Sequence, residues 1–276
     1  MAVTKEDAEA SSFLPFFDGE GTQKIYKYYL KIKYETCNIV LKTILYDLQI
    51  PKGDEHLMSK FFAHAQDPVS CETHAIGAAA AFAGGVLFLF RAVRVGAPVM
   101  ALAAAMCFCL SMIALYSASA IYHYYPGDAE SGGVKRRLRK MDHSMIYVLI
   151  AGSYTPFSLV LLPQPKGARF CLAIWAVAIA GVLVKLLWMN APRVLSTFFY
   201  LAMGWAVLFA WEDFKVLGQP CLTLVALGGA CYSVGAVFYA VKKPNISAEW
   251  TFHELFHILI LAGSFFHYLA VYFYVL

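Results

Sequence analysis

Charged side chains are scarce in this chain: Asp, Glu, Lys and Arg make up only 14% of its 276 residues, whereas soluble proteins carry about 25%. The charges that are present lie in short runs between long apolar stretches. This scarcity excludes a soluble globular domain. With a net charge of only +4, the chain also lacks the basic surface that nucleic-acid binding needs. We expect an integral, multi-pass membrane protein.

The chain also lacks cysteine pairs at the C-x-x-C spacing of zinc and redox motifs. Its seven cysteines are an odd number and mostly lie in apolar segments, where cysteine acts as a small apolar residue. No secretory signal is visible, because Lys5, Glu6 and Asp7 are charged and no apolar core follows directly. We therefore expect free cysteines and insertion through the first apolar span.

Residues 1–66 differ in pattern from the rest of the chain. After a turn-rich stretch, apolar residues recur at helical spacing from Tyr26 to Leu48, with lysines interleaved. This pattern predicts a basic amphipathic helix that ends at Pro51. Such a helix lies on an anionic membrane surface or packs on the membrane domain, and an ordinary surface helix is an equally good interpretation. We assign 1–66 as a cytoplasmic extension and 67–276 as the membrane domain.

Seven apolar segments follow, each near the length of about 20 residues that spans a bilayer as a helix. The fold class is therefore all-α, a bundle of seven transmembrane helices. The segments lie at 71–93, 98–124, 141–162, 169–189, 194–214, 219–241 and 252–275. In the third, Pro156 predicts a kink. That kink either opens a cavity for a lipid chain or accompanies tight packing of the small residues beside it.

The basic residues between the segments predict the orientation. If the N-terminus is cytoplasmic, 11 Lys and Arg residues near the ends of the spans lie inside and 5 lie outside. We therefore predict a cytoplasmic N-terminus and an external C-terminus, in the plasma membrane or in an internal membrane.

This topology brings polar residues from three spans to the cytoplasmic leaflet. The second span ends at Ser119 and His123, the third begins at Asp142, and the last begins at His253 and His257. The last two histidines are four residues apart, so they share one helix face. Ionisable side chains inside a membrane mark a functional site by default. Three neutral imidazoles with an open position for water are the ligand set of a catalytic zinc site.

We interpret His123, His253 and His257 as zinc ligands, Asp142 as the general base and Ser119 as a hydrogen-bond donor to a developing oxyanion. A different interpretation remains open for two of them. A single buried histidine is commonly a hydrogen-bonded packing residue, which applies to His123 taken alone. Asp142 would also suit the N-terminal cap of a helix.

Three further histidines have weaker claims. His267 lies about 15 Å beyond His257 along the last span, so we expect it to lie too near the outer face to join the site. His74, at the start of the first span, suits packing or support. His143 follows Asp142 directly, so we expect it to point towards the membrane interface.

The last span also contains the H-E-x-x-H pattern of metalloproteases, with Glu254 as the base. An intramembrane protease usually has this pattern in an early helix and a separate aspartate motif. Here it lies in the last helix and His123 offers the third ligand, so we rank a protease low.

Three segments resemble the hemolysin III family of the progestin and adiponectin receptor superfamily, which is also similar in its motifs to alkaline ceramidases. They are Ser119-Ala120-Ile121-Tyr122-His123, the run from Leu138 to Phe157, and His253-Glu254-Leu255-Phe256-His257. The resemblance covers about residues 70–276, with the motifs in the family's order.

The resemblance implies seven helices, a cytoplasmic N-terminus, and zinc near the cytoplasmic side on His123, His253 and His257. It also implies that Asp142 contacts the zinc-bound water and that Ser119 lies nearby. Two departures stand out. Ser70 occupies a position often filled by Asn, and residues 1–66 exceed the short lead of bacterial relatives.

Three functions suit these features. The first is a zinc-dependent hydrolase that cleaves a ceramide-like lipid amide. The second is a pore-forming cytolysin, and the third is a ligand-sensing receptor in which zinc is structural. Each has membrane lipids as partners, and the first and third add a lipid substrate or ligand.

Overall fold

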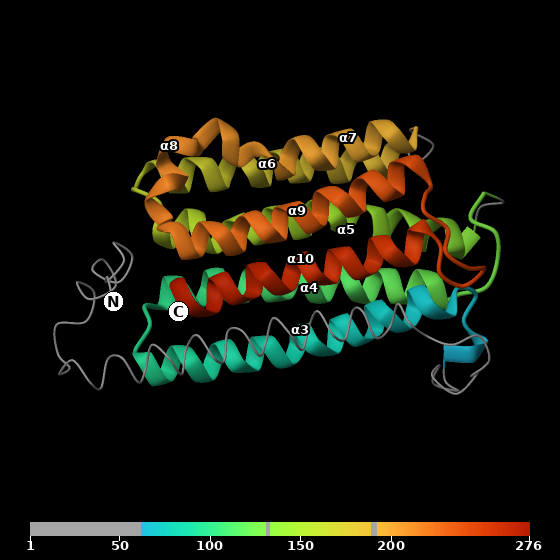
Figure 1. The fold of residues 1–276 in the computed structure, drawn as a ribbon, viewed down its shortest axis with the longest axis horizontal. Helices are drawn as coiled ribbons and strands as arrows, with labels where there is room; N and C mark the ends of the chain where they lie inside the picture. The colour runs from blue at the N-terminus through green and yellow to red at the C-terminus, as the bar shows by residue number, and fades with distance from the viewer. Residues whose placement is uncertain (1–61, 131–132, 189–191) are drawn as a thin grey trace, which may run out of the picture. The chain divides into compact units, whose positions relative to one another are not determined.

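The computed structural model describes residues 62–130, 133–188 and 192–276 (Figure 1). Every regular element in these ranges is a helix, and seven helical stretches are long and apolar enough to cross a membrane. After η1 (Phe62–His64), they are α3 (Pro68–Val95), α4 (Val99–Tyr124), α5 (Gly133–Pro156) with η2 (Phe157–Leu161), α6 (Lys166–Leu187), α7 (Arg193–Gly204) with short helices to Leu217, α9 (Gln219–Val241) and α10 (Phe252–Tyr274). The predicted seven-helix fold is confirmed.

Three predictions from the sequence are not tested by the described residues. The amphipathic helix expected between residues 24 and 50 lies outside the described residues, and the domain boundary at 66/67 stays a prediction. The same holds for which end of the bundle faces the cytoplasm.

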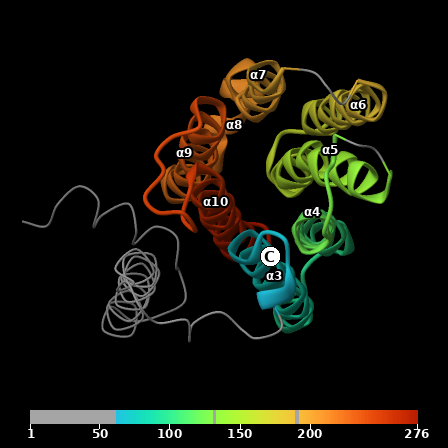
Figure 2. The same ribbon diagram turned by 90° about the vertical axis from the view of Figure 1, so that its right-hand side faces the viewer.

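Helices that follow one another in sequence pack against one another in space. The strongest pairings are α3 with α4, α4 with α5, and α9 with α10, and α10 returns to pack on α3. Figure 2 looks along the bundle and shows this order, with α6 outside α5 and α7 beside α9. Because successive spans run in opposite directions, α3, α5 and α10 begin at the end of the bundle where α4 finishes (Figure 1).

The third span begins earlier than its apolar run predicts. The basic residues that precede the run are helical too, so α5 starts at Gly133 and not near 141. Asp142 therefore lies about two and a half turns inside the helix. The interpretation of Asp142 as a helix cap is wrong for this reason.

Two spans lose regular α-helical geometry at membrane depth. At Pro156 α5 gives way to the π-helix η2, because proline has no N–H for the helical ladder. In the fifth span, α7 ends at Gly204 and is followed by η3 (Ala206–Ala210), α8 (Trp211–Phe214) and η4 (Lys215–Leu217). Tyr154 joins the two breaks: its hydroxyl donates to the Gly204 carbonyl at 2.5 Å and accepts from the Val207 N–H at 3.2 Å.

Small residues bring α4 and α5 into close contact, as expected for the run before Pro156. A Cβ atom added at Gly152 would lie 2.2 Å from Ser111 Oγ and 2.6 Å from Ser111 Cβ. No side chain larger than hydrogen fits there. The contact fixes α5 against α4, and so fixes the two helices that carry Asp142 and His123.

Candidate metal centre

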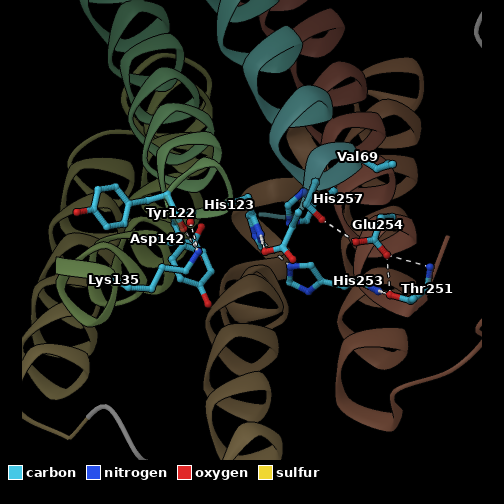
Figure 3. Close-up of polar contacts among 12 residues, drawn as sticks. Val69, Tyr122, His123, Lys135, Asp142, Thr251, His253, Glu254 and His257 are labelled. Atoms are coloured by element: carbon cyan, nitrogen blue, oxygen red, sulfur yellow. Dashed lines mark hydrogen bonds and ion pairs between the residues drawn. The ribbon is translucent and has the colours of Figure 1, made fainter. Parts of the chain in front are cut away.

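Three histidines meet at the end of the bundle where α4 finishes and α10 begins. His123 lies one residue before the end of α4, and His253 and His257 lie in the first two turns of α10. One nitrogen from each ring lies within 4.8 Å of the others. Figure 3 shows the three rings converging. His123 and His257 are almost fully buried. The structure thus brings together the three residues that the sequence singled out.

The geometry of these nitrogens fits a metal ion. His123 Nε2 and His253 Nε2 are 3.2 Å apart. Two imidazole nitrogens on one tetrahedral zinc ion, each about 2.0–2.1 Å from it, are separated by about 3.3–3.4 Å. Imidazole nitrogen is also a ligand that zinc prefers. The three histidines could therefore hold a metal ion.

The start of α3 orients two of the imidazoles. His123 Nδ1 is 2.9 Å from Asp67 Oδ2, and His257 Nδ1 is 3.5 Å from Thr73 Oγ1. A carboxylate only accepts hydrogen bonds, so Nδ1 of His123 carries the proton and Nε2 keeps its lone pair. Such a carboxylate–histidine pair fixes the ring of a metal ligand and raises its basicity.

Asp67 is the functional residue that sequence reasoning missed. Its side chain is 43% exposed, and the hydrogen bond from His123 lowers the pKa of its carboxyl group below the usual value. Its backbone N–H also donates to the His123 carbonyl at 3.0 Å. The sequence did contain a signal that could have identified Asp67: it is a carboxylate directly before Pro68, at the end of the first span that lies with the histidines.

Glu254 has a different role from the base of a metalloprotease. One of its oxygens accepts from Ser70 Oγ at 2.8 Å. The other accepts from the backbone N–H and the hydroxyl of Thr251, at 2.9 and 2.6 Å. Together with the Thr251 side chain this is a capping box, which starts α10. Figure 3 shows the carboxylate turned towards Thr251 and away from the three rings.

Asp142 and Ser119 line the same cavity as His253 and His257. Ser119 Oγ is buried without a protein partner. Asp142 is 9% exposed, and its nearest ion-pair partner is His143, 3.6 Å away. The structure therefore places both residues on the cavity wall, where a ligand near the histidines would meet them.

Two neighbouring histidines support this end of the cavity. His74 stacks on His257 with ring centroids 3.7 Å apart and planes at 1°, so its predicted supporting position is confirmed. His143 does not point to the interface as expected. It lines the cavity, its Nδ1–H donates to the Arg139 carbonyl, and its Nε2 accepts from the Tyr239 hydroxyl at 3.1 Å. That hydroxyl on α9 draws the ring inwards.

The cavity has a volume of about 490 Å³ and extends along the bundle. At one end it is lined by Asp142, His253 and His257, and at the other by Lys215 and Gln219. Between them the wall is mainly apolar and includes Phe157, next to the proline that ends α5. A chain of methylene groups is the kind of ligand that such a wall accepts.

Comparison with known proteins identifies relatives that share this region. A family profile described as Haemolysin-III related matches residues 62–268, which include every site residue from Asp67 to His257. The chain is 33% identical over 207 residues to Hemolysin-3 of Bacillus cereus, covering 74% of this chain and 89% of that protein.

Two further relatives are similar to the chain over shorter lengths. The chain is 36% identical over 168 residues to a Hemolysin-3 homolog of Bacillus subtilis (strain 168), covering 60% of this chain and 75% of the relative. It is 28% identical over 157 residues to an adiponectin receptor protein of Drosophila melanogaster, covering 48% of this chain and 34% of that protein.

Proposed function

We propose that this chain, which belongs to the haemolysin-III related family within the progestin and adiponectin receptor superfamily, is a zinc-dependent hydrolase of lipid amides. One observation carries the proposal. Three imidazoles lie close enough to share a metal ion, and two of them line one end of a long apolar cavity together with a carboxylate and an unpaired hydroxyl.

Each residue of the site has a separate role in the proposed reaction. His123, His253 and His257 would hold zinc, which when bound supplies Lewis acidity and a nucleophile from water at neutral pH. Asp142 takes up the proton released by the attacking water and returns it to the leaving amide nitrogen. Ser119 Oγ–H has no protein acceptor and donates to the carbonyl oxygen as negative charge develops on it.

The cavity supplies binding and orientation. Its apolar wall takes the acyl chain and excludes bulk water from the carbonyl end. A ceramide-like lipid fits this arrangement, because it places one amide between a polar head and a long chain. Asp67 and Thr73 keep the ligand nitrogens of His123 and His257 pointing at the metal position.

Metal content and lipid turnover test the proposal together. Purified wild-type protein should contain about one zinc ion per chain by elemental analysis and should hydrolyse a ceramide, detected by mass spectrometry. We expect His123→Ala to lose both, and Asp142→Asn to lose turnover while keeping zinc.

Asp213→Asn is the matched control, because Asp213 pairs with Lys166 at the other end of the bundle. It should keep both zinc and turnover. Unchanged zinc in His123→Ala would contradict the three-histidine site. Full turnover in Asp142→Asn would remove Asp142 as the base.

The names of the relatives support two alternatives, cytolysis and ligand sensing. Liposomes loaded with dye separate them from the hydrolase. Dye release that survives His253→Ala would favour a pore, and lipid binding without any turnover would favour a receptor in which the metal is structural.

A further inference from the structure

The wall of the cavity includes one unpaired polar atom that lies away from the metal end. Among the described residues, three cavity-lining side chains have a buried polar atom without a protein partner: His74, Ser119 and His267. The first two lie at the metal end. His267 lies about 15 Å further along α10 than His257, which is about half the thickness of the hydrocarbon core.

The hydrogen bonding of His267 defines what it can accept. Its Nε2 is 3.2 Å from the Val225 carbonyl, and a carbonyl oxygen only accepts, so Nε2 carries the proton. Nδ1 is therefore a bare acceptor, and it is buried without a partner. An unpaired buried acceptor is unfavourable, so this position favours a ligand that brings a donor and disfavours one that brings a carbonyl.

The ring cannot turn to find a partner within the protein. Gly228 packs on it so closely that an added Cβ would lie 2.4 Å from His267 Cδ2. The rings of Tyr232 and Phe157 meet it edge to face, with centroids 5.3 and 6.4 Å away. His267 is only 7% exposed. His267, which lines the cavity, is thus held in place by its neighbours.

Neighbouring hydroxyl groups differ from His267 because each already has a hydrogen-bond partner within the protein. Ser153, Tyr154 and Ser233 also line the cavity, and each donates its proton to a backbone carbonyl, of Ile150, Gly204 and Gly229 respectively. The acceptor that lacks a partner, and to which a donor on a ligand could bind, is therefore His267 Nδ1.

We propose that the cavity recognises a lipid whose chain carries a hydroxyl group near its middle, and that this hydroxyl donates to His267 Nδ1. The inference rests on the proposed use of the cavity by a lipid chain, but not on the metal. It assigns to His267 a role in choosing the chain, separate from any reaction at the head of the cavity.

Three fatty acids of equal length test the proposal: octadecanoic acid, its isomer hydroxylated in mid-chain, and its isomer hydroxylated next to the carboxyl group. Full-length protein in detergent micelles is titrated with each, by displacement of a fluorescent fatty acid. Wild type should bind the mid-chain isomer about tenfold more tightly than the other two, the effect of one hydrogen bond to an otherwise unpaired acceptor.

Two variants locate the effect. His267→Phe keeps an aromatic ring but removes both Nδ1 and the Nε2–H that donates to the Val225 carbonyl, so it should bind all three acids alike. Tyr268→Phe removes a hydroxyl that donates to the Gly84 carbonyl and does not line the cavity, so it should keep the tenfold preference. Binding of plain octadecanoic acid shows in each case that the cavity is intact.

Equal affinities in wild type would overturn the inference and assign Nδ1 to a bound water molecule. A preference that persists in His267→Phe would do the same. If that variant does not fold, histidine-labelled NMR of wild type decides: the His267 Nδ1 resonance should shift with the mid-chain isomer only. Protein stripped of metal with a chelator should retain the preference, whereas its loss of lipid turnover bears on the proposed hydrolase alone.

Discussion

Asp67 gives the sharpest test of how this centre is built. Asp67→Ala removes the acceptor of the His123 Nδ1–H, 2.9 Å away. The His123 ring can then place its proton on either nitrogen, and only one of these forms offers Nε2 to a metal. Loss of such an outer partner lowers metal affinity by about 10–100-fold. Because the Asp67 side chain is 43% exposed and water can replace it, we expect about tenfold, or about 1.4 kcal/mol.

The assay is competition for zinc with a coloured chelator, on purified protein in detergent at neutral pH. Asp67→Asn keeps an oxygen acceptor without the charge, so its loss should be smaller than that of Asp67→Ala. Glu130→Ala is the control, since Glu130 is a surface carboxylate that pairs with Arg139 and has no contact with the three rings. An unchanged zinc affinity in Asp67→Ala, or an equal loss in Glu130→Ala, would refute the reasoning.

Two further predictions concern the framework around the site. Glu254→Ala should lower stability by about 0.5–2 kcal/mol through loss of the helix cap while zinc content stays at the wild-type level, as measured by thermal unfolding and elemental analysis; loss of zinc would show that Glu254 does more than start α10. Gly152→Ala should destabilise the bundle by about 1–3 kcal/mol through the clash with Ser111, whereas Gly204→Ala, with no atom within 4 Å of the added Cβ, should leave the unfolding temperature nearly unchanged.

The sequence predicted the spans well because their physical cause is local. A run of about 20 apolar residues has few alternatives to a membrane helix, and alternating helix direction then brings His123 and His253 to the same end. The predicted ends of the spans were less accurate where a helix extends beyond its apolar residues. The basic run before Asp142 is polar yet helical, so α5 starts earlier than its apolar part.

Contacts between distant segments could not be predicted in this way. The hydrogen bond between Asp67 and His123 depends on how the residues before α3 pack against the end of α4. The hydrophobic periodicity of the sequence does not predict that packing. The inward turn of His143 depends in the same way on Tyr239, a residue 96 positions away. In the fifth span, the helix ends at Gly204, and the carbonyl of Gly204 accepts a hydrogen bond from Tyr154 on another helix.

The start of α3 emerges as the support of the whole centre. The candidate ligands come from α4 and α10, yet three of the contacts that hold them come from one short segment. Asp67 bonds to His123, Thr73 meets His257, and Ser70 bonds to the capping carboxylate of Glu254. Each imidazole that α3 supports presents its other nitrogen to the metal position. Asp67 is 43% exposed, whereas His123 and His257 are buried, and His253 and His257 also line the apolar cavity. The start of α3 therefore supports the two buried imidazoles from the solvent-exposed end of the bundle.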